Sequence, residues 1–465
     1  MKNYNKKVVE FTLLTTFILL LYSVYISVSG NNALSLNNIS IVSDVLLETK
    51  LPTKNSSIED SNSFTNYLIN KSDTSLEVIK DPVIVEKEVV KYLTAKELIS
   101  FNNDSNSAAL PKFMQKLLTL SRGNKKKVRI AWLGDSIIEG DLLTKSFRKR
   151  IQQYFGGFGV GFVPATSITA GFRNTVTHKW KGDWKEESFK SNILKAPLFL
   201  SGHTFYTKNG TIILSDKTIF DTIQHIEKCL LCGKAKGEIQ ISVNGQAKQY
   251  KAGKLFNRLV LDTSTDHEIN VTIEDDSFPI YGISLEPQSG IVVDNFSFRG
   301  ITGLELGKLD SAFLVNVNEE NNYDLVVLEY GANLMFRPND VDYSWYRSHI
   351  MKVVNKLRKA MPNSEFLIVS TSDRAFRYEE TWKTAVGMNN LLKAQAELAI
   401  NNNAAFFNMY ASMGGWGTIV NWADNIPSLA NKDYIHPNFL GAEKLGNLLF
   451  DAFMKDYKKV CKDSI

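Results

Sequence analysis

Two short stretches, far apart in the chain, carry residues that could perform nucleophilic catalysis. The sequence GDS ends at Ser136, just after an apolar run, and Asp433 precedes His436 by three positions in the sequence DYIHP. A serine in the turn after a strand can expose its hydroxyl, and an imidazole held by a carboxylate can accept the hydroxyl proton. A simpler reading is a helix cap at Ser136 and a surface-loop histidine at His436. Together, the two stretches predict a nucleophile, Ser136, a general base, His436, and an orienting carboxylate, Asp433.

Two further strand ends carry hydrogen-bond donors. The run NFSFR ends at Gly300, and the run LVVLEY leads into Gly331 and Asn333. A glycine leaves its backbone N–H unobstructed, and an asparagine side chain offers an NH₂ group. The backbone N–H groups of Ser136 and Gly300 and the side chain of Asn333 could therefore converge on one developing oxyanion. The alternative is that the glycines and Asn333 only form turns.

The elements around these residues predict an α/β fold with a parallel sheet. Short apolar runs, typical of buried parallel strands, cover Lys127–Leu133, Asp324–Glu329, Glu365–Ser370 and Ala404–Asn408. Helical spacing of apolar residues is found over Asp141–Phe155 and near 341–360, 379–401 and 440–457. This alternation indicates a doubly wound α/β domain, with the candidate residues at strand ends and just before the last helix.

One stretch interrupts the alternation, from about residue 185 to 290. Short β-rich runs follow one another there without a helix-length pattern, over 238–243, 258–262, 268–274 and 280–285. The pair Asn244 and Gly245 after the first run is a signal for a two-residue hairpin. We therefore expect a small antiparallel β domain, residues 185–290, inserted into a discontinuous α/β domain of residues 96–184 and 291–465.

The N-terminus has the pattern of an export or anchor signal. Three lysines precede an apolar run from Phe11 to Val28, close to the ~20 residues that a membrane-spanning helix needs. Residues 1–30 are thus predicted to be a signal anchor, or a signal peptide that is cleaved near Gly30; a buried core helix is the third reading. Residues 31–95, rich in Asn, Ser, Asp and Lys, predict a flexible tether. The catalytic domain would then lie on the outer, periplasmic or extracytoplasmic, side of the cytoplasmic membrane, or be secreted if the signal is cleaved.

Composition limits the possible partners. The 465 residues are 44% hydrophobic and 22% charged with a net charge of +5, and no dense basic block stands beside aromatic residues, so nucleic acid is not expected as a partner. Cys229 and Cys232, with His225 nearby, could contribute to a metal site, but no fourth ligand is evident, which favours buried thiols or a local disulfide. Arg374 follows a predicted strand and could line a cleft or form a surface ion pair.

The order of the motifs resembles that of the SGNH/GDSL hydrolase superfamily. GDS, then a strand-end glycine, then GxN, then DxxH succeed one another along the predicted α/β part of the chain. The resemblance implies that Ser136 is the nucleophile and that Asp433 and His436 complete a catalytic triad. It also implies that Gly300 and Asn333 donate hydrogen bonds to the oxyanion, and that neither a metal nor an organic cofactor takes part.

A narrower resemblance is carried by the surroundings of the motifs. The glycine-rich stretch 155–164 (FGGFGVGFVP), the sequence MGGW ending at Trp416, and Trp422 are similar to the peptidoglycan O-acetylesterase branch, whose members carry an inserted β-rich domain of carbohydrate-binding type. Ile137 departs from that branch, where a polar residue, often histidine, follows the nucleophile. The resemblance implies an esterase whose substrate is an acetylated glycan of the cell envelope, most simply peptidoglycan. Together with the N-terminal signal, it predicts a membrane-anchored enzyme. An O-acetyltransferase that uses the same acyl-enzyme and a non-catalytic glycan-binding protein are the alternatives.

Overall fold

The structure is a computed structural model that describes residues 35–36, 39–40, 91–100, 107–219 and 223–462. The chain divides into two units, Met1–Asp81 and Pro82–Ile465. In the first unit, β1 (Ser35–Leu36) pairs with β2 (Ile39–Ser40) in antiparallel fashion. The predicted signal or anchor over 1–30 and most of the predicted tether over 31–95 lie outside the described residues. No helix within the described part of the chain is long and apolar enough to span a membrane.

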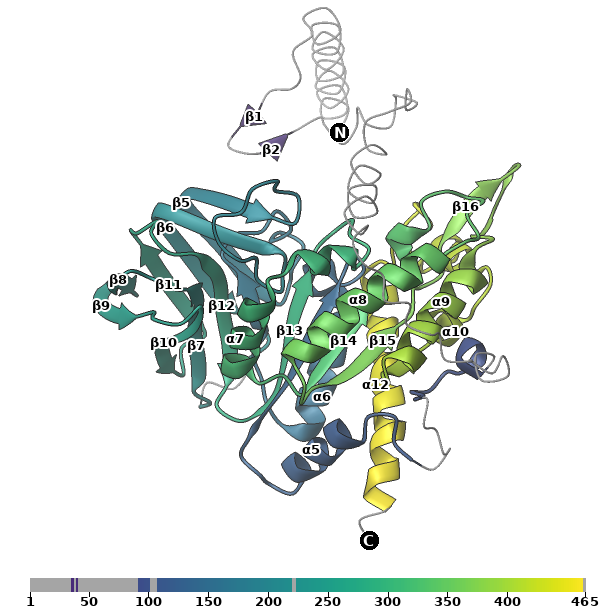
Figure 1. Ribbon diagram of the computed structural model, residues 1–465, viewed down its shortest axis with the longest axis horizontal. Helices are drawn as coiled ribbons and strands as arrows, with labels where there is room; N and C mark the ends of the chain where they lie inside the picture. The colour runs from purple at the N-terminus through teal and green to yellow at the C-terminus, as the bar shows by residue number, and fades with distance from the viewer. Residues whose placement is uncertain (1–34, 37–38, 41–90, 101–106, 220–222, 463–465) are drawn as a thin grey trace, which may run out of the picture. The chain divides into compact units, whose positions relative to one another are not determined.

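A five-stranded parallel sheet forms the centre of the second unit (Figure 1). Its strands, in spatial order, are β13 (Gly290–Ser297), β3 (Lys127–Gly134), β14 (Leu325–Glu329), β15 (Glu365–Val369) and β18 (Ala405–Phe407). These strands are apolar and almost wholly buried, because helices cover the sheet. The last residues of β13, β3, β14 and β15 stand in register, so the loops that follow these strands leave from one edge.

Two groups of helices pack on the parallel sheet. One group is α5 (Pro111–Ser121), α6 (Leu142–Phe155) and α12 (Phe439–Lys462); the other is α7 (Ser311–Asn321), α8 (Ser344–Ala360) and α9 (Met388–Asn401). Two shorter helices, α10 (Met409–Met413) and α11 (Thr418–Asp424), precede α12. Trp132 of β3, Phe147 of α6 and Phe453 of α12 meet edge to face in the core. The packing fixes where β3 ends and α12 begins, the two places that carry Ser136 and His436.

A nine-stranded antiparallel sheet lies beside the parallel one, as the teal strands of Figure 1 show. Its strands are β4 (Gly161–Pro164), β5 (Val176–Ser188), β6 (His203–Asp216), β7 (Ile226–Gly233), β8 (Glu238–Val243), β9 (Gln246–Lys251), β10 (Phe256–Ser264), β11 (Glu268–Ile273) and β12 (Ile280–Pro287). The predicted two-residue turn joins β8 to β9, with positive φ at Asn244 and Gly245 (51° and 82°). The mixed α/β class, with one parallel and one antiparallel sheet, is therefore confirmed.

Several element boundaries differ from those predicted. The antiparallel sheet already includes β4 and β5, so residue 185, the predicted start of the insertion, falls inside β5. The predicted start of the helix near residue 379 is wrong. β16 (Ala375–Tyr378) and β17 (Thr381–Thr384) form a hairpin there, and α9 begins only at Met388. Threonine and tryptophan favour strand over helix at these positions, and Glu379 adopts a positive φ of 55° in the turn. The folded part also begins before residue 96, since Tyr92 is buried and its carbonyl accepts a bond from Asn408.

Candidate active site

Ser136, His436 and Asp433 form one hydrogen-bonded chain at the carboxyl edge of the parallel sheet. Ser136 Oγ lies 2.9 Å from His436 Nε2, and His436 Nδ1 lies 2.7 Å from Asp433 Oδ2. Asp433 Oδ1 also accepts the backbone N–H groups of Ile435 and His436, at 2.9 and 3.0 Å. The three side chains singled out in the sequence, 300 positions apart at their widest, thus meet in the arrangement of a nucleophile, a base and an orienting carboxylate.

The loop that carries Asp433 and His436 is held from several sides. Tyr434, between them, has a left-handed φ of 57°, a costly conformation for an aromatic residue. Its backbone N–H donates to Asn431, its carbonyl accepts from Ala375, and its ring stacks on Trp382 of the β16–β17 hairpin. Burial disfavours the charge on Asp433, but the bonds from His436 and the backbone N–H groups hold the pKa of Asp433 below its usual range.

Two buried carboxyl groups, Asp135 and Glu329, lie close to Ser136. Burial raises the pKa of Asp135 to about 6, against the lowering effect of the hydrogen bond from Ile137 and the nearby His436. Burial and the neighbouring Asp135 raise the pKa of Glu329, the last residue of β14, to about 8. Glu329 Oε2 accepts a hydrogen bond of 2.9 Å from the indole N–H of Trp132. At neutral pH Glu329 is therefore mostly protonated, whereas Asp135 is mostly ionised.

The predicted oxyanion donors differ in whether their N–H groups already form hydrogen bonds within the protein. Gly300 has a φ of 78° and is exposed, and its backbone N–H has no acceptor among the described residues. The side-chain amide of Asn333 instead donates to Asp135 Oδ2 at 3.0 Å and to the carbonyl of Ile301 at 2.9 Å. Both hydrogens of that amide are thus engaged within the protein, and donation to a substrate oxygen requires one of these bonds to be shared.

A cavity of about 640 Å³ opens over Ser136, and Gly300, Asn333 and His436 also line it. The structure therefore brings four of the five predicted site residues to one surface, with Asp433 behind His436. Sequence reasoning missed other lining residues, Leu142, Phe172, Lys190, Arg299, Asn438 and Phe439. They come from loops and helix ends, and nothing in the local sequence indicates that their side chains reach this cavity.

Arg374 has neither of the roles weighed from the sequence. Its Nη1 donates to the carbonyl of Ala332 at 2.5 Å, in the short loop that also carries Asn333. Its guanidinium stacks on Phe376, 4.6 Å from the ring centroid. Burial lowers the pKa of Arg374 to about 10, so the side chain remains charged at neutral pH. Arg374 therefore supports the Asn333 loop from the side of the β16–β17 hairpin.

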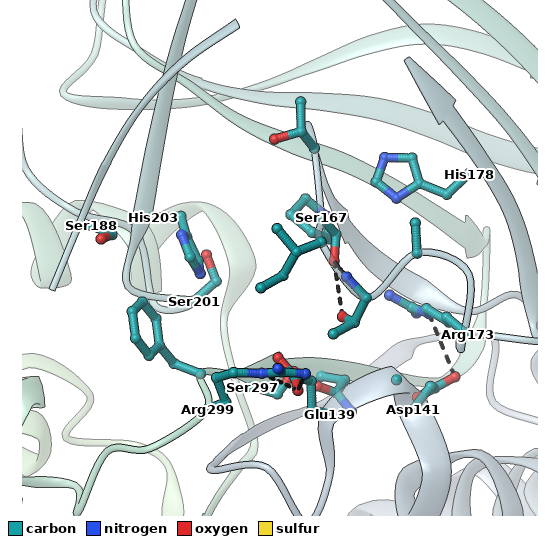
Figure 2. A pocket seen from close by; sticks show the side chains of 18 of the residues that line it. Glu139, Asp141, Ser167, Arg173, His178, Ser188, Ser201, His203, Ser297 and Arg299 are labelled. Carbon is teal, nitrogen blue, oxygen red and sulfur yellow. Dashed lines mark hydrogen bonds and ion pairs between the residues drawn. The ribbon is translucent and has the colours of Figure 1, made fainter. Parts of the chain in front are cut away.

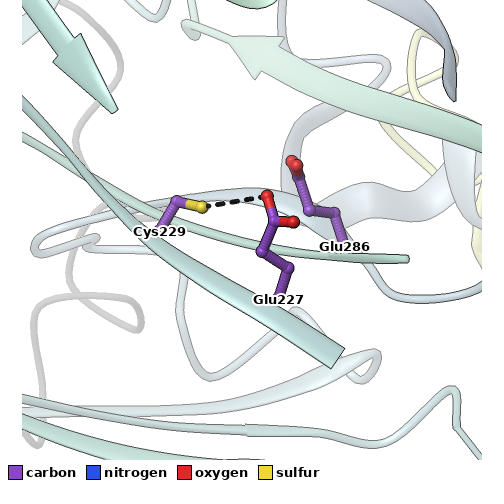
Figure 3. Close-up of side chains that lie close together, drawn as sticks. All are labelled: Glu227, Cys229 and Glu286. Carbon is purple, nitrogen blue, oxygen red and sulfur yellow. Dashed lines mark hydrogen bonds between the residues drawn. The ribbon is translucent and has the colours of Figure 1, made fainter. Parts of the chain in front are cut away.

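A cluster of acidic and thiol side chains lies away from this site. Glu227, Cys229 and Glu286 each place one potential metal ligand within 4.8 Å of the others (Figure 3). However, Glu286 already contacts three cations, Lys127, Arg129 and Arg258, at 2.5–2.7 Å. These cations outweigh the effect of burial and hold the pKa of Glu286 well below its usual value. A metal ion would add a further positive charge to a carboxylate that is already neutralised, so the residues fit a structural ion cluster better than a metal centre.

The cysteines of β7 form no disulfide in the described part of the chain. Cys229 and Cys232 are both free and buried, which confirms the buried-thiol interpretation and rules out a local disulfide between them. Burial raises the pKa of each thiol to about 12, so neither is a thiolate at neutral pH. His225 is exposed and does not join the cluster.

Comparison with known proteins supports the fold on structural grounds. No family model matches the sequence, and no curated protein matches it. A solved structure titled "Peptidoglycan O-acetylesterase in action" superposes with a TM-score of 0.64 over 78% of this chain and 99% of that chain, at 23% identity. Matches with TM-scores of only 0.26 and 0.27 include a family two carbohydrate esterase from Cellvibrio japonicus (10% identity, 60% of this chain, 99% of that one) and an acetyl xylan esterase (16%, 35% and 81%).

The fold and the motif order together define the class that this protein resembles. The parallel sheet with Ser136 after β3, and Asp433 and His436 before α12, has the arrangement that the SGNH/GDSL motifs predicted. The resemblance to SGNH/GDSL hydrolases is thereby confirmed. The peptidoglycan O-acetylesterase structure is similar to this chain over nearly its whole length.

Proposed function

We propose that this protein is a serine esterase that removes O-acetyl groups from a cell-envelope glycan, peptidoglycan in the first instance. The observation that carries the proposal is the hydrogen-bonded chain from Ser136 through His436 to Asp433. The similarity of the fold to a structure described as a peptidoglycan O-acetylesterase supports the choice of bond and substrate. We further propose that residues 1–30 export the protein and anchor it in the cytoplasmic membrane, with the catalytic domain on the outer side.

In the first half-reaction, Ser136 Oγ attacks the acetyl carbonyl carbon while His436 Nε2 takes the hydroxyl proton. The carbonyl electron pair moves to the oxygen, where the backbone N–H groups of Ser136 and Gly300 stabilise the oxyanion. Asn333 is the third donor when its amide shares a hydrogen with that oxygen. The intermediate collapses, the bond to the sugar oxygen breaks, and His436 returns the proton to the leaving sugar hydroxyl.

In the second half-reaction, water replaces the sugar. His436 Nε2 removes a proton from water as the water oxygen attacks the acetyl carbon, and collapse releases acetate and restores the Ser136 hydroxyl. Throughout, Asp433 keeps Nδ1 protonated and stabilises the imidazolium. Apart from the substrate and water, these steps use only groups of this chain.

The proposal is tested by measuring acetate released by the full chain from O-acetylated peptidoglycan, from acetylated xylan and from p-nitrophenyl acetate. We expect release from all three that depends on Ser136, with the highest kcat/KM on peptidoglycan. The same reactions are analysed for newly acetylated sugar in the presence of an unacetylated glycan. Acetyl transfer without net acetate release would replace hydrolysis by an acetyltransferase activity, and no turnover of any ester would overturn the proposal.

A further inference from the structure

A second cavity adjoins the catalytic one. It has a volume of about 190 Å³ and is lined by residues of β4, β5 and β6 and of the end of β13. Figure 2 shows the side chains of residues that line it. The two cavities share five lining residues, Glu139, Gly140, Thr169, Lys190 and Arg299. A ligand bound over Ser136 can therefore continue from one cavity into the other without leaving the protein surface.

The second cavity contains polar atoms that have no hydrogen-bond partner within the described part of the chain. Ser201 is only 3% exposed, and its hydroxyl oxygen has no hydrogen-bond partner among the described residues. Such a group is costly to bury unless a ligand or water bonds to it. His203, at the start of β6, uses Nδ1 to contact Glu186 at 2.7 Å, and its Nε2 has no partner in the described part of the chain. Both residues line the cavity and are labelled in Figure 2.

One wall of the cavity also has an aromatic surface. The imidazole of His203 stacks on Phe298, with ring centroids 4.7 Å apart and an interplanar angle of 22°. Phe298 directly precedes Arg299 and Gly300, so this stack is continuous with the strand end that borders the catalytic cavity. Apolar ring surface combined with a few placed hydrogen-bonding groups is the usual composition of a site for a small organic ligand.

Most of the charged side chains that line the second cavity already contact a partner within the protein. Asp141 accepts a bidentate bond from Arg148 and lies 3.8 Å from Arg173. Glu139 pairs with Arg299, and Glu186 contacts the His203 ring. The cation that lacks a carboxylate partner among the described residues is Lys190, which is exposed at the wall shared with the catalytic cavity. Away from the Lys190 ammonium at this shared wall, the groups left for a ligand in the second cavity are hydroxyl and imidazole groups, which suit a neutral ligand rich in hydroxyl or amide groups.

We propose that this cavity is a subsite that binds a neutral sugar unit next to the unit whose ester is cleaved. Ser201 Oγ and His203 Nε2 bond to its hydroxyl or acetamido groups, and Phe298 adds apolar surface to the wall beside it. The inference rests on the proposed function, since it makes the second cavity the place where a neighbouring unit of the acetylated glycan is recognised. The esterase would then prefer an acetylated oligosaccharide to an acetylated monosaccharide.

The kinetic test compares an O-acetylated N-acetylglucosamine disaccharide with the corresponding O-acetylated monosaccharide. We expect the wild type to favour the disaccharide in kcat/KM, and Ser201→Ala and His203→Ala each to reduce that preference by about three- to tenfold, the effect of losing one or two hydrogen bonds. His349→Ala, on α8 and outside both cavities, is the matched control and should keep the wild-type preference. Variants that keep the full preference for the disaccharide would overturn the subsite while leaving the esterase activity established.

A binding measurement separates failure of the subsite from failure of the proposed function. Calorimetric titration of the Ser136→Ala chain with unacetylated N,N′-diacetylchitobiose needs no turnover. We expect binding that His203→Ala weakens by at least about threefold in the Ser136→Ala background. Equal binding by the two chains, or binding only of an acidic disaccharide such as di-galacturonic acid, would overturn the neutral subsite. An absence of ester hydrolysis together with chitobiose binding that depends on His203 would instead overturn the esterase function alone.

Discussion

The indole ring of Trp382 stacks on the phenol ring of Tyr434, with centroids 4.3 Å apart and an interplanar angle of 26°. Tyr434 stands between Asp433 and His436, so the β16–β17 hairpin contacts the loop that carries two of the three residues of the hydrogen-bonded chain. The stack, together with the bond from Ala375 N–H to the Tyr434 carbonyl, holds the left-handed backbone at Tyr434. The hairpin therefore positions the His436 loop without lining the cavity over Ser136.

Replacing Trp382 by alanine should lower kcat by about two- to tenfold, because an aromatic pair of this kind contributes ~0.5–1.5 kcal/mol. KM for p-nitrophenyl acetate should change little, since Trp382 lines neither cavity. Trp382→Phe should restore most of the activity. Trp345→Ala on α8 is the control. A kcat for Trp382→Ala equal to that of the control would show that the stack does not position the loop.

Asp433→Asn should abolish most activity and leave the fold intact. The amide cannot hold His436 Nδ1–H in the tautomer that leaves Nε2 free to accept the proton of Ser136. The loss in kcat should be ~10³–10⁴-fold, the scale seen when an orienting aspartate of such a triad becomes asparagine. Stopped assays at several pH values, with circular dichroism to verify folding, provide the measurement. A loss of less than about tenfold would remove Asp433 from the catalytic set.

Glu329→Gln should change how stability depends on pH. The pKa of Glu329 is raised from an ordinary value near 4.5 to about 8, so between these values the unfolded chain releases a proton that the folded chain keeps. The unfolding free energy of the wild type then falls by about 1.4 kcal/mol per pH unit across this window through Glu329. The glutamine variant lacks this contribution. It should match the wild type near pH 4 and be more stable by roughly 3 kcal/mol at pH 7.

Urea denaturation of both chains across this pH range measures the difference. The hydrogen bond from Trp132 can be kept by the glutamine oxygen, so packing should be little disturbed. If the unfolding free energies of the two chains changed in parallel with pH, Glu329 would release its proton at the same pH in the folded and the unfolded chain. That result would contradict the raised pKa.

The ion cluster around Glu286 should be essential for the junction of the two sheets. Glu286 of β12 is fully buried and bonds to Arg129 of the parallel sheet and to Arg258 of β10. Glu286→Gln leaves these cations without their shared counter-charge, which should cost ~3–5 kcal/mol of unfolding free energy. Glu238→Gln, in an exposed pair with Lys251 at 3.2 Å, should cost less than ~1 kcal/mol. Denaturant titration measures the unfolding free energy of both variants. If Glu286→Gln lost as little unfolding free energy as Glu238→Gln, the structural role of the cluster would be contradicted.

The sequence predicted the parts of the site that depend on local order. Ser136 and Gly300 follow apolar strands, and because parallel strands all end at one edge of a sheet, their strand ends were expected to meet. Asp433 and His436 lie within a single turn of chain, so their contact is also local. The hairpin at β8 and β9 was predicted for the same reason, since Asn244 and Gly245 define the turn by themselves.

The remaining features depend on contacts between distant segments. Phe172 and Lys190 reach the catalytic cavity from loops of irregular conformation, which leave no periodic pattern. β5 was missed because most of its side chains are exposed or half-buried, so it shows little of the apolar alternation by which strands are recognised. The bond from Asn333 to Asp135 and the stack of Trp382 on Tyr434 are tertiary contacts, and only the three-dimensional structure reveals them.

The most direct test of the central claim is whether an acetyl group is carried by Ser136. The full chain is mixed with p-nitrophenyl acetate, quenched in acid within the first turnover, digested and analysed by mass spectrometry, beside Ser136→Ala and the remote control Ser348→Ala. We expect an acetylated peptide that contains Ser136 in the wild type and the control, and a loss of several orders of magnitude in turnover for Ser136→Ala. Two results together would contradict the account. They are turnover by Ser136→Ala close to that of the wild type, and no acetyl group on Ser136 in the wild type or in the Ser348→Ala control.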